Sequence, residues 1–439
     1  MSNLQSHFNQ QLDTCRKGTR RWVVGLSGGL DSIVLLHLAA RSIPADQLLV
    51  VNIDHQLQQQ SSQWAVFCEK QAASLNLPFQ CLKVAVDVSA SIERAARNAR
   101  YKAFEGLLQP GDCLLLAHHL DDQAETMLFR LLRGTGLRGL TGMPVTRLLG
   151  HSKLLRPLLN AFRYELLSWA EQEQLEWIED PSNSELVFDR NYLRHEVMPL
   201  LQVRWPGFAR RWGETARYLR EAEQLQNELA EIDLASVGER SLLNCESLVS
   251  LSRPRRNNLL RYWFKQAGFS IGERQIQSVL QLVNAAADRQ PELKLPGLRV
   301  LRYQGVIRLH PDLPETQWGN RPVTEKGLET QQGVLTVQLD SGETGLRSLS
   351  GVIVRNRLEG DRCQPLGRGG SCSLKKLFQE HNVPPWQRNS WPVCVVEEEI
   401  VALPGICVCD GWQSEKKGHG FTLKWSPTAL SVRVDSDTL

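Results

Sequence analysis

The sequence predicts an α/β protein with an N-terminal parallel-sheet domain, a mostly helical middle domain and a small β-containing C-terminal domain. Two patterns carry this prediction. From about residue 21 to 120, short apolar runs alternate with stretches of helical period, which is typical of a parallel sheet covered on both faces. From Val334 onward, the pattern changes to short β-rich runs separated by turns.

The N-terminal elements alternate regularly. The expected strands are Trp22–Leu26, Leu48–Ile53, Phe79–Val84 and Cys113–Ala117. The expected helices between them are Ser32–Ala40, Ser61–Leu75 and Ser91–Leu108. Because parallel sheets bind ligands beyond the carboxyl ends of their strands, the residues just after each apolar run are the first candidates for chemistry.

The N-terminal domain is expected to span residues 1–215, because helical segments at Phe162–Gln174 and Arg190–Leu201 follow the sheet region. A long amphipathic helix then leads into a middle domain over residues 216–312. One face of this helix is marked by Leu219, Ala222, Leu225, Leu229 and Ile232. The middle domain is helical at first and closes with two strands, Arg299–Tyr303 and Val306–Leu309.

A linker and a β-rich domain complete the predicted order. The segment Pro311–Gly333 is rich in Pro, Thr, Gln and Gly, which is typical of a linker. The C-terminal domain is expected over residues 334–439, with strands at Leu335–Leu339, Val352–Arg355, Val393–Val396 and Phe421–Trp425.

Composition places the 439-residue chain among ordinary globular proteins, with 42% hydrophobic and 23% charged residues. No apolar run is long enough to span a bilayer, and the N-terminus lacks the apolar stretch of a secretory signal. We therefore expect a cytoplasmic protein with no membrane partner. Ten cysteines without dense, regular spacing indicate reduced thiols. Cys407 and Cys409 are the closest pair, but one intervening residue makes neither a zinc knuckle nor a redox motif.

The sharpest motif is a glycine-containing loop between the first strand and the first helix of the alternation. It reads Ser27-Gly28-Gly29-Leu30-Asp31-Ser32. Two glycines let successive N–H groups face an anion, and the helix N-terminus adds its positive dipole end. The spacing fits neither a Walker P-loop nor a dinucleotide-binding fingerprint, so we expect a pyrophosphate cradle of another class. The plainer alternative is a β-α turn in which Asp31 starts the helix.

Asp54 and His55 follow the second strand and should lie on the same edge of the sheet as the loop. This position makes them candidates for contacting a ligand bound at the loop. The alternative is that Asp54 is a turn residue and His55 a partly exposed surface imidazole.

A cluster of histidines and acidic residues follows the fourth strand. His118 and His119 precede Asp121, Asp122 and Glu125, and in a helix Asp122 and Glu125 share one face. Carboxylates here can hold Mg²⁺ on ATP phosphates or bind the ammonium group of an amine substrate. Zinc is a weaker reading, because no cysteine ligands lie nearby. Charge complementarity at a helix N-terminus is the alternative.

Glu93, Arg97, Arg100 and Tyr101 fall along one side of the preceding helix. Guanidinium groups near a nucleotide site can grip phosphates bidentately. A helical ion-pair ladder would produce a similar pattern, so both interpretations stand.

Together these segments resemble the tRNA(Ile)-lysidine synthetase family of N-type ATP pyrophosphatases. The resemblance rests on SGGLDS, on IDH after the second strand, on ERAARNARY and on AHHLDDQAETMLFRLLRGTGLRGLTGM. It continues through RPLL, EDPSN and RNYLR, and reappears downstream as LKKLFQE followed by VPPWQR. One departure is Gln58, where related enzymes often have Arg, which leaves the role of a cation there in doubt.

The resemblance implies ATP-dependent ligation of free L-lysine to the wobble cytidine of the CAU-anticodon tRNA(Ile). ATP adenylates the cytosine O2, and the ε-amine of lysine then displaces AMP. The residues from Ser27 to Ser32 would bind ATP with Asp54 and His55, and Asp31 would hold Mg²⁺. Asp122 and Glu125 would bind lysine. By the match, the residues that contact the activated base and its AMP are Arg97, Arg100, His118 and Arg190.

The downstream half carries candidates for binding the tRNA body, namely Lys375, Lys376, Trp386 and Arg388, with Trp391 nearby. For each residue alone, a packed tryptophan or a solvated charge is the plainer reading. The oligomeric state, including a homodimer, stays open. One rival function is a tRNA thiolase, which would need reactive cysteines beside the loop, often as C-x-x-C, and this pattern is absent from the sequence. Another is a catalytically idle tRNA-binding protein.

Overall fold

The computed structural model describes residues 3–56, 61–86, 92–181, 185–285, 291–340, 345–415 and 419–427. Gln58, and Ser182 and Asn183 of the EDPSN motif, lie outside these residues. The chain divides into two compact units, Met1–Asn227 and Glu228–Leu439. Within the described residues, no helix is both long enough and apolar enough to cross a membrane.

The first unit is built on a six-stranded sheet with the order β3-β2-β1-β4-β6-β5. Its parallel strands are β1 (Arg21–Gly25), β2 (Leu48–Asp54), β3 (Phe79–Lys83), β4 (Asp112–Leu115) and β6 (Ser152–Leu155). The edge strand β5 (Thr146–Leu149) is antiparallel to β6. The four strands expected from the sequence are confirmed. The β5–β6 hairpin was not predicted, because β5 is an exposed edge strand without a clear apolar alternation.

The strand order reverses between β1 and β4, which are direct neighbours in the sheet. In open α/β sheets, ligands bind outside the carboxyl ends of the strands at such a switch point. The glycine loop follows β1 and the histidine pair follows β4. The topology therefore brings the two motifs to the same place.

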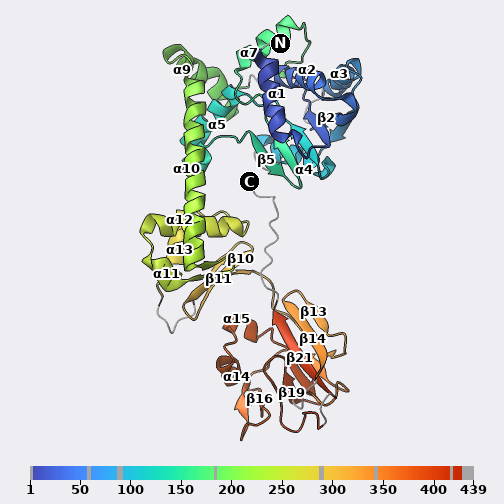
Figure 1. Ribbon diagram of the computed structural model, residues 1–439, viewed down its shortest axis with the longest axis vertical. Coiled ribbons are helices and arrows are strands. Elements are labelled where there is room, and N and C mark those ends of the chain that lie inside the picture. The colour runs from blue at the N-terminus through green and yellow to red at the C-terminus, as the bar shows by residue number, and fades with distance from the viewer. Residues whose placement is uncertain are drawn as a thin grey trace. The chain divides into compact units, whose positions relative to one another are not determined.

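Helices cover both faces of this sheet (Figure 1). They include α1 (Asn3–Arg16), α2 (Leu30–Ser42), α3 (Ser61–Ser74), α4 (Ile92–Leu107), α5 (Leu120–Leu132) and α7 (Arg163–Gln172). Successive strand residues enter different cores: Trp22 and Val24 pack with α1 and α2, whereas Val23 packs with Phe104 of α4. This two-residue alternation explains why the strands read as continuous apolar runs.

A series of helices closes the first unit. They are α6 (Leu137–Leu140), α8 (Asp189–Tyr192), a π-helical segment (Leu193–Val197), α9 (Met198–Arg204) and the long α10 (Phe208–Val237). The predicted boundary between residues 215 and 216 thus falls inside α10. The helix is confirmed, but Leu225 and Ile232 of its expected apolar face are 66% and 65% exposed. The buried positions of α10 are instead Phe208, Ala209, Ala216, Ala230, Asp233 and Val237.

The second unit begins with a helical layer on a five-stranded antiparallel sheet of order β7-β8-β11-β10-β9. The strands are β7 (Gly238–Glu239), β8 (Leu242–Asn244), β9 (Glu292–Leu295), β10 (Leu298–Tyr303) and β11 (Val306–Pro311). The helices are α11 (Cys245–Ser250), α12 (Arg253–Gln266) and α13 (Glu273–Val283). Trp263 and Phe264 of α12 anchor the core between them. The sequence predicted the helices and the last two strands.

The C-terminal part of this unit is rich in short strands. Its first strands are β12 (Arg321–Pro322), β13 (Leu328–Thr330), β14 (Gly333–Asp340), β15 (Ile353–Arg355), β16 (Arg362–Cys363) and β17 (Cys372–Ser373). After α14 (Leu374–Glu380) and α15 (Pro385–Arg388) come β18 (Val393–Val396), β19 (Glu399–Leu403), β20 (Cys407–Val408) and β21 (Gly420–Pro427).

The predicted linker at Pro311–Gly333 is wrong in its central part. Trp318 is fully buried and Val323 is 4% exposed, and both belong to the core of the C-terminal part. The Trp318 indole N–H donates to the Ser390 carbonyl at 3.1 Å. Pro, Thr and Gly content suggested a linker, but one tryptophan packed among β-strands ties the segment to the domain.

Candidate active site

The glycine loop follows β1 in a conformation that only glycine adopts easily. Gly28 has a φ of +88°, and a Cβ built there would lie 3.3 Å from Cys68 Sγ and 3.4 Å from Ile178 Cδ1. The Ile178 N–H donates to the Gly28 carbonyl at 2.9 Å. The loop is thus fixed from behind by a second segment, and a side chain at Gly28 would disturb that contact.

The start of α2 offers free hydrogen-bond donors. Gly29 is the N-cap and gives no side-chain cap, so first-turn N–H groups remain for an anion. The Ser27 and Ser32 hydroxyls lie 3.1 Å apart, and the Ser32 hydroxyl donates to the Gly29 carbonyl at 2.9 Å. These contacts preorganise a concave group of donors suited to a pyrophosphate.

His118 and His119 follow β4 and differ in charge. Burial lowers the pKa of His118 well below its usual value, with Arg156 and Arg100 adding to the effect. Its Nδ1 is buried without a hydrogen-bond partner among the described residues. His118 is therefore neutral at pH 7 and has one ring nitrogen available to a ligand.

His119 is surrounded by carboxylates. Its Nε2 lies 3.4 Å from Asp122 Oδ2 and 3.7 Å from Asp31 Oδ2, and its Nδ1 lies 3.5 Å from Asp121 Oδ2. Burial opposes the charged ring, but Asp122 and its neighbours outweigh burial and raise the pKa of His119 to about 9. The Asp122 N–H lies 3.4 Å from the same Nδ1, a long contact that the neutral ring alone could accept. Because three carboxylates favour the imidazolium, we assign Nδ1–H as a donor to Asp121.

Asp31 is the least satisfied carboxylate of the site. Its Oδ1 is buried without a hydrogen-bond partner among the described residues, and Arg163 Nε lies 3.9 Å from it. Burial raises the pKa of Asp31, Asp122 raises it further, and His119 only partly offsets them. A cation at this oxygen would favour the charged form of Asp31.

Asp122 and Glu125 of α5 are paired with arginines. Arg194 Nε donates to Glu125 Oε1 at 2.7 Å, and Arg194 NH2 donates to Asp122 Oδ1 at 3.0 Å. Arg190 Nε lies 3.3 Å from Glu125 Oε2. Burial would raise the pKa of Asp122, but His119, His118 and the two arginines hold it below its usual range. The Asp122 carboxylate is therefore charged, and both carboxylates already have cationic partners.

Arginines of α4 and β5 surround the phenol ring of Tyr101. Arg97 and Arg147 lie 5.1 and 4.8 Å from the Tyr101 ring centroid. Although burial opposes it, Arg97 and further arginines lower the pKa of Tyr101 to about 8. Arg100 is half-buried, burial lowers its pKa, and its buried Nε has no hydrogen-bond partner among the described residues. Arg100 is therefore a cation available to an anion.

A cavity of about 1620 Å³ joins these groups within the first unit. It is lined by most of the residues that the sequence singled out: Ser27, Gly29, Leu30, Asp31, Ser32, Asp54, His55, Arg100, His118, Asp122 and Glu125. Gly28, Arg97 and Arg190 do not line it. Gly28 shapes the loop from behind, Arg97 packs on Tyr101, and Arg190 supports Glu125.

Known proteins match the chain along nearly its whole length. The PP-loop domain family matches residues 1–201, the TilS substrate binding domain residues 243–308, and the TilS substrate C-terminal domain residues 352–425. A tRNA(Ile)-lysidine synthase from Alkalilimnicola ehrlichii is 42% identical over 404 residues, which cover 88% of this chain and 89% of that protein. The chain belongs to the tRNA(Ile)-lysidine synthase family. Synthases from Coxiella burnetii (35% identical, 92% of this chain, 93% of that protein) and Pseudomonas aeruginosa (39%, 97% and 97%) agree with this assignment.

The chain is therefore a ligase with an ATP-binding PP-loop domain. Several residues that line the cavity of this synthase were not predicted from the sequence as site residues. His119 and Asp121 stood inside the histidine and acidic motif, but their roles were not assigned. Arg163 and Arg194 were missed as site residues. Arg194 lies four residues after Arg190, a spacing that places both on one helical face, and this was the available signal.

The residues of the C-terminal part of this lysidine synthase that were predicted to bind tRNA differ in their exposure to solvent. Lys375 and Lys376 are exposed on α14. Trp386 is half-buried against Tyr303, with ring centroids 5.7 Å apart, and Arg388 Nε donates to the Val383 carbonyl at 2.8 Å. Trp391 is 8% exposed and its indole donates to the Pro404 carbonyl. Trp391 is therefore a core residue, and the prediction that its ring offers a stacking surface to tRNA is wrong.

Proposed function

We propose that this enzyme ligates L-lysine to C2 of cytidine 34 in the CAU-anticodon tRNA(Ile) through an adenylated cytidine, in the cytoplasm. The products are lysidine, AMP and pyrophosphate, and the tRNA changes from methionine to isoleucine identity and AUA decoding. One observation carries the proposal: the glycine loop, the histidine pair and the Asp122–Glu125 carboxylates line one cavity at the switch point of the sheet.

ATP binding begins at the loop. The donors at the start of α2, with the Ser27 and Ser32 hydroxyls, suit the β and γ phosphates that leave as pyrophosphate. Asp54 and His55 lie at the end of β2 on the same cavity wall, where they can contact the adenosine. Mg²⁺ fits beside Asp31, whose buried Oδ1 lacks a partner among the described residues, and when bound it would neutralise phosphate charge.

Adenylation joins the cytosine O2 to the α phosphorus as the bond to pyrophosphate breaks. Arg100 lines the cavity and has a free Nε for the negative charge that develops on the α phosphate. The neutral His118 can position the base, or it can accept a proton from the base at its free Nδ1. Arg97 and Arg190 act one layer behind, since neither lines the cavity.

Lysine binding at Asp122 and Glu125 must compete with guanidinium groups. Glu125 accepts hydrogen bonds from Arg194 at 2.7 and 2.9 Å and from Arg190 at 3.3 Å. These contacts show that the carboxylates pair with cationic donors. An ammonium group of lysine is also a cationic donor, so it would replace the arginines or bind beside them. Displaced arginines would then be free to bind phosphate, which would couple lysine binding to the nucleotide.

The thiolase alternative is opposed by the cysteine nearest the loop. Cys68 Sγ lies behind Gly28, but burial raises the pKa of its thiol to about 12, so no thiolate forms near neutral pH. Burial also raises the pKa of Cys81, which lies on β3. Neither cysteine has the environment of an activated nucleophile.

The deciding experiment incubates the enzyme with ATP, radiolabelled lysine and tRNA(Ile) carrying a CAU anticodon. Label should enter this tRNA only when ATP is present, with AMP formed in equal amount. A transcript with uridine at position 34 is the matched control and should stay unlabelled. ATP binding without label transfer would instead support an idle tRNA-binding protein.

A further inference from the structure

Three cysteines of the C-terminal part converge, although Cys363 is distant in sequence from Cys407 and Cys409. The sulfur atoms of Cys363, Cys407 and Cys409 all lie within 4.8 Å of one another. Cys363 and Cys409 are buried and Cys407 is half-buried. The sequence interpretation considered only the Cys407–Cys409 pair, so the third member was not foreseen.

Backbone pairing holds the two cysteine-bearing segments together. The Leu366 N–H donates to the Val408 carbonyl at 3.0 Å, and the Asp410 N–H donates to the Gln364 carbonyl at 2.8 Å. An isolated β-bridge joins Pro365 to Cys409. The backbone therefore brings the two cysteine-bearing segments together and keeps them aligned.

A fourth cysteine stands next to the group. Cys372 of β17 is paired directly with Cys363 of β16 in an antiparallel ladder. Residues directly opposite in such a ladder point to the same face, with Cβ atoms about 4.5 to 5.5 Å apart. Cys372 is buried and lies outside the three-sulfur group as it stands. To join the group, the Cys372 side chain would rotate about its χ1 angle from this position on the same face of the hairpin.

We propose that Cys363, Cys372, Cys407 and Cys409 bind one structural Zn²⁺ as thiolates. Tetrahedral zinc with bonds of about 2.3 Å to sulfur places its ligand atoms about 3.8 Å apart, which the observed spacing accommodates. Closed four-cysteine sites are typical of structural rather than catalytic zinc. A disulfide would use only two of the four sulfurs and leave the others buried beside it.

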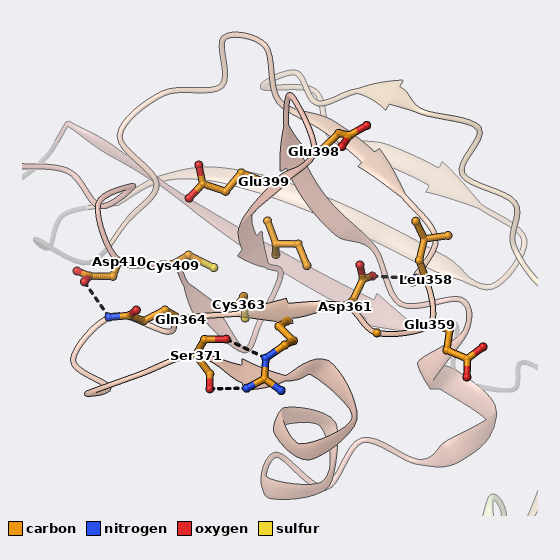
Figure 2. A pocket seen from close by; sticks show the side chains of 13 residues that line it. Leu358, Glu359, Asp361, Cys363, Gln364, Ser371, Glu398, Glu399, Cys409 and Asp410 are labelled. Carbon is orange, nitrogen blue, oxygen red and sulfur yellow. Dashed lines mark hydrogen bonds between the residues drawn. The ribbon is translucent and has the colours of Figure 1, made fainter.

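A nearby cavity of about 610 Å³ offers a path for the cation. Figure 2 shows Cys363 and Cys409 at its wall, with the Glu398, Glu399 and Asp410 carboxylates around the same space. Carboxylates at the mouth of a cleft concentrate divalent cations by their field. A metal site also needs an entry path, and this cavity supplies one.

The metal would fix the start of the basic helix α14. Cys372 directly precedes Ser373, the N-cap of α14, whose hydroxyl accepts a hydrogen bond from the Lys376 N–H at 3.3 Å. Zinc would tie the β16–β17 hairpin to β20 and so hold Lys375 and Lys376 in place. This inference is independent of the proposed lysine ligation, because it concerns only the folding of the C-terminal part.

The first test measures metal in the full-length enzyme purified without chelators. Elemental analysis should give about one zinc per chain, with neither iron nor acid-labile sulfide. Cys409→Ser and Cys363→Ser should each lose the zinc. Cys394→Ala is the matched control, because Cys394 is a buried cysteine of the same core outside the cluster, and it should keep the zinc. Zinc retained in both serine variants would overturn the proposal, as would a wild-type enzyme without zinc.

A second measurement needs no variant and so does not depend on the folding of one. Modification of the wild-type thiols with an organomercurial should release the zinc, as measured with a chromogenic chelator. Replacement by Co²⁺ should give a thiolate-to-metal charge-transfer band and the strong visible bands of tetrahedral cobalt. Octahedral cobalt spectra, or a disulfide between any two of these four cysteines in the freshly purified enzyme, would overturn the proposal. Cys372→Ser separates a four-sulfur site from a three-sulfur site, because only the former loses zinc affinity.

Discussion

His119 Nε2 lies 3.4 Å from Asp122 Oδ2, and this contact joins the end of β4 to the first turn of α5. The imidazole also approaches Asp31 and Asp121. The charge of the nucleotide site is therefore tied to the protonation of one buried histidine.

The stability of the metal-free enzyme should depend on pH through His119. Its pKa is raised to about 9 in the folded state, above the unfolded value of 6.5. A raised pKa stabilises the fold fully below the unfolded pKa, and this contribution is lost as pH rises through 9. Urea titrations in EDTA should show the free energy of unfolding falling between pH 6.5 and 9, by roughly 3 kcal/mol at most. His119→Gln should remove most of this slope; an equally steep slope in the variant would contradict the assignment.

Asp31→Ala should abolish AMP formation and leave the fold intact. It removes the carboxylate proposed to hold Mg²⁺, and its buried Oδ1 makes no hydrogen bond that the structure describes. Loss of one such interaction is worth at least about tenfold in rate, so activity above about a tenth of wild type would count against the role. Asp46→Ala is the control, because Asp46 is exposed in the turn before β2.

Glu125→Gln should impair lysine use more than adenylation. The amide keeps the shape but loses the charge that pairs with an ammonium group and with Arg194. The assay compares tRNA-dependent pyrophosphate release with lysine incorporation at several lysine concentrations. A parallel fall of both would make Glu125 a structural partner of Arg194 and refute its role as a lysine ligand.

Gly28→Ala should destabilise the loop by about 1 to 3 kcal/mol, because an alanine at φ +88° is strained and its Cβ would crowd Cys68 and Ile178. ATP affinity should fall as well. Gly106→Ala is the matched control, since a Cβ there meets nothing within 4 Å. Thermal melts with and without ATP distinguish the two; equal behaviour would mean that the loop adapts.

Replacing Lys375 and Lys376 with Ala should weaken tRNA binding and make its salt dependence shallower, by about one unit of log–log slope for each phosphate that the variant no longer neutralises. Lys326→Ala is the control, because Lys326 is also exposed in the C-terminal part. Unchanged affinity and slope would leave recognition to other residues, such as Trp386 and Arg388.

A truncation that removes the C-terminal part must not leave residues of its core exposed on the remaining chain. A chain ending near Gln332 would keep Trp318 and Val323 but remove the strands that cover them. Ending after Asp312 avoids this exposure. The shorter chain should retain ATP binding and lose most tRNA affinity; retention of full tRNA affinity would exclude the C-terminal part from recognition.

The sequence predicted elements whose periodicity is local. The four central strands and the loop after β1 were found because apolar runs and glycines mark them within a few residues. Relations set by tertiary packing were not visible, such as Arg194 on Glu125 and Trp318 in a distant core. Charge states were also beyond reach, since His118 and His119 are adjacent in sequence and differ only in their surroundings.

The Asp122 side chain caps the first turn of α5, because it accepts from the His119 backbone N–H at 3.1 Å. The same carboxylate also faces the His119 imidazole at 3.4 Å and so takes part in the charge of the site. A substitution that tunes the charge of the cavity at this position therefore also loosens the helix that presents Asp122 and Glu125. A substitution here therefore changes activity and stability together. Adaptation of this enzyme to a new pH or temperature would require substitutions at the surrounding residues instead.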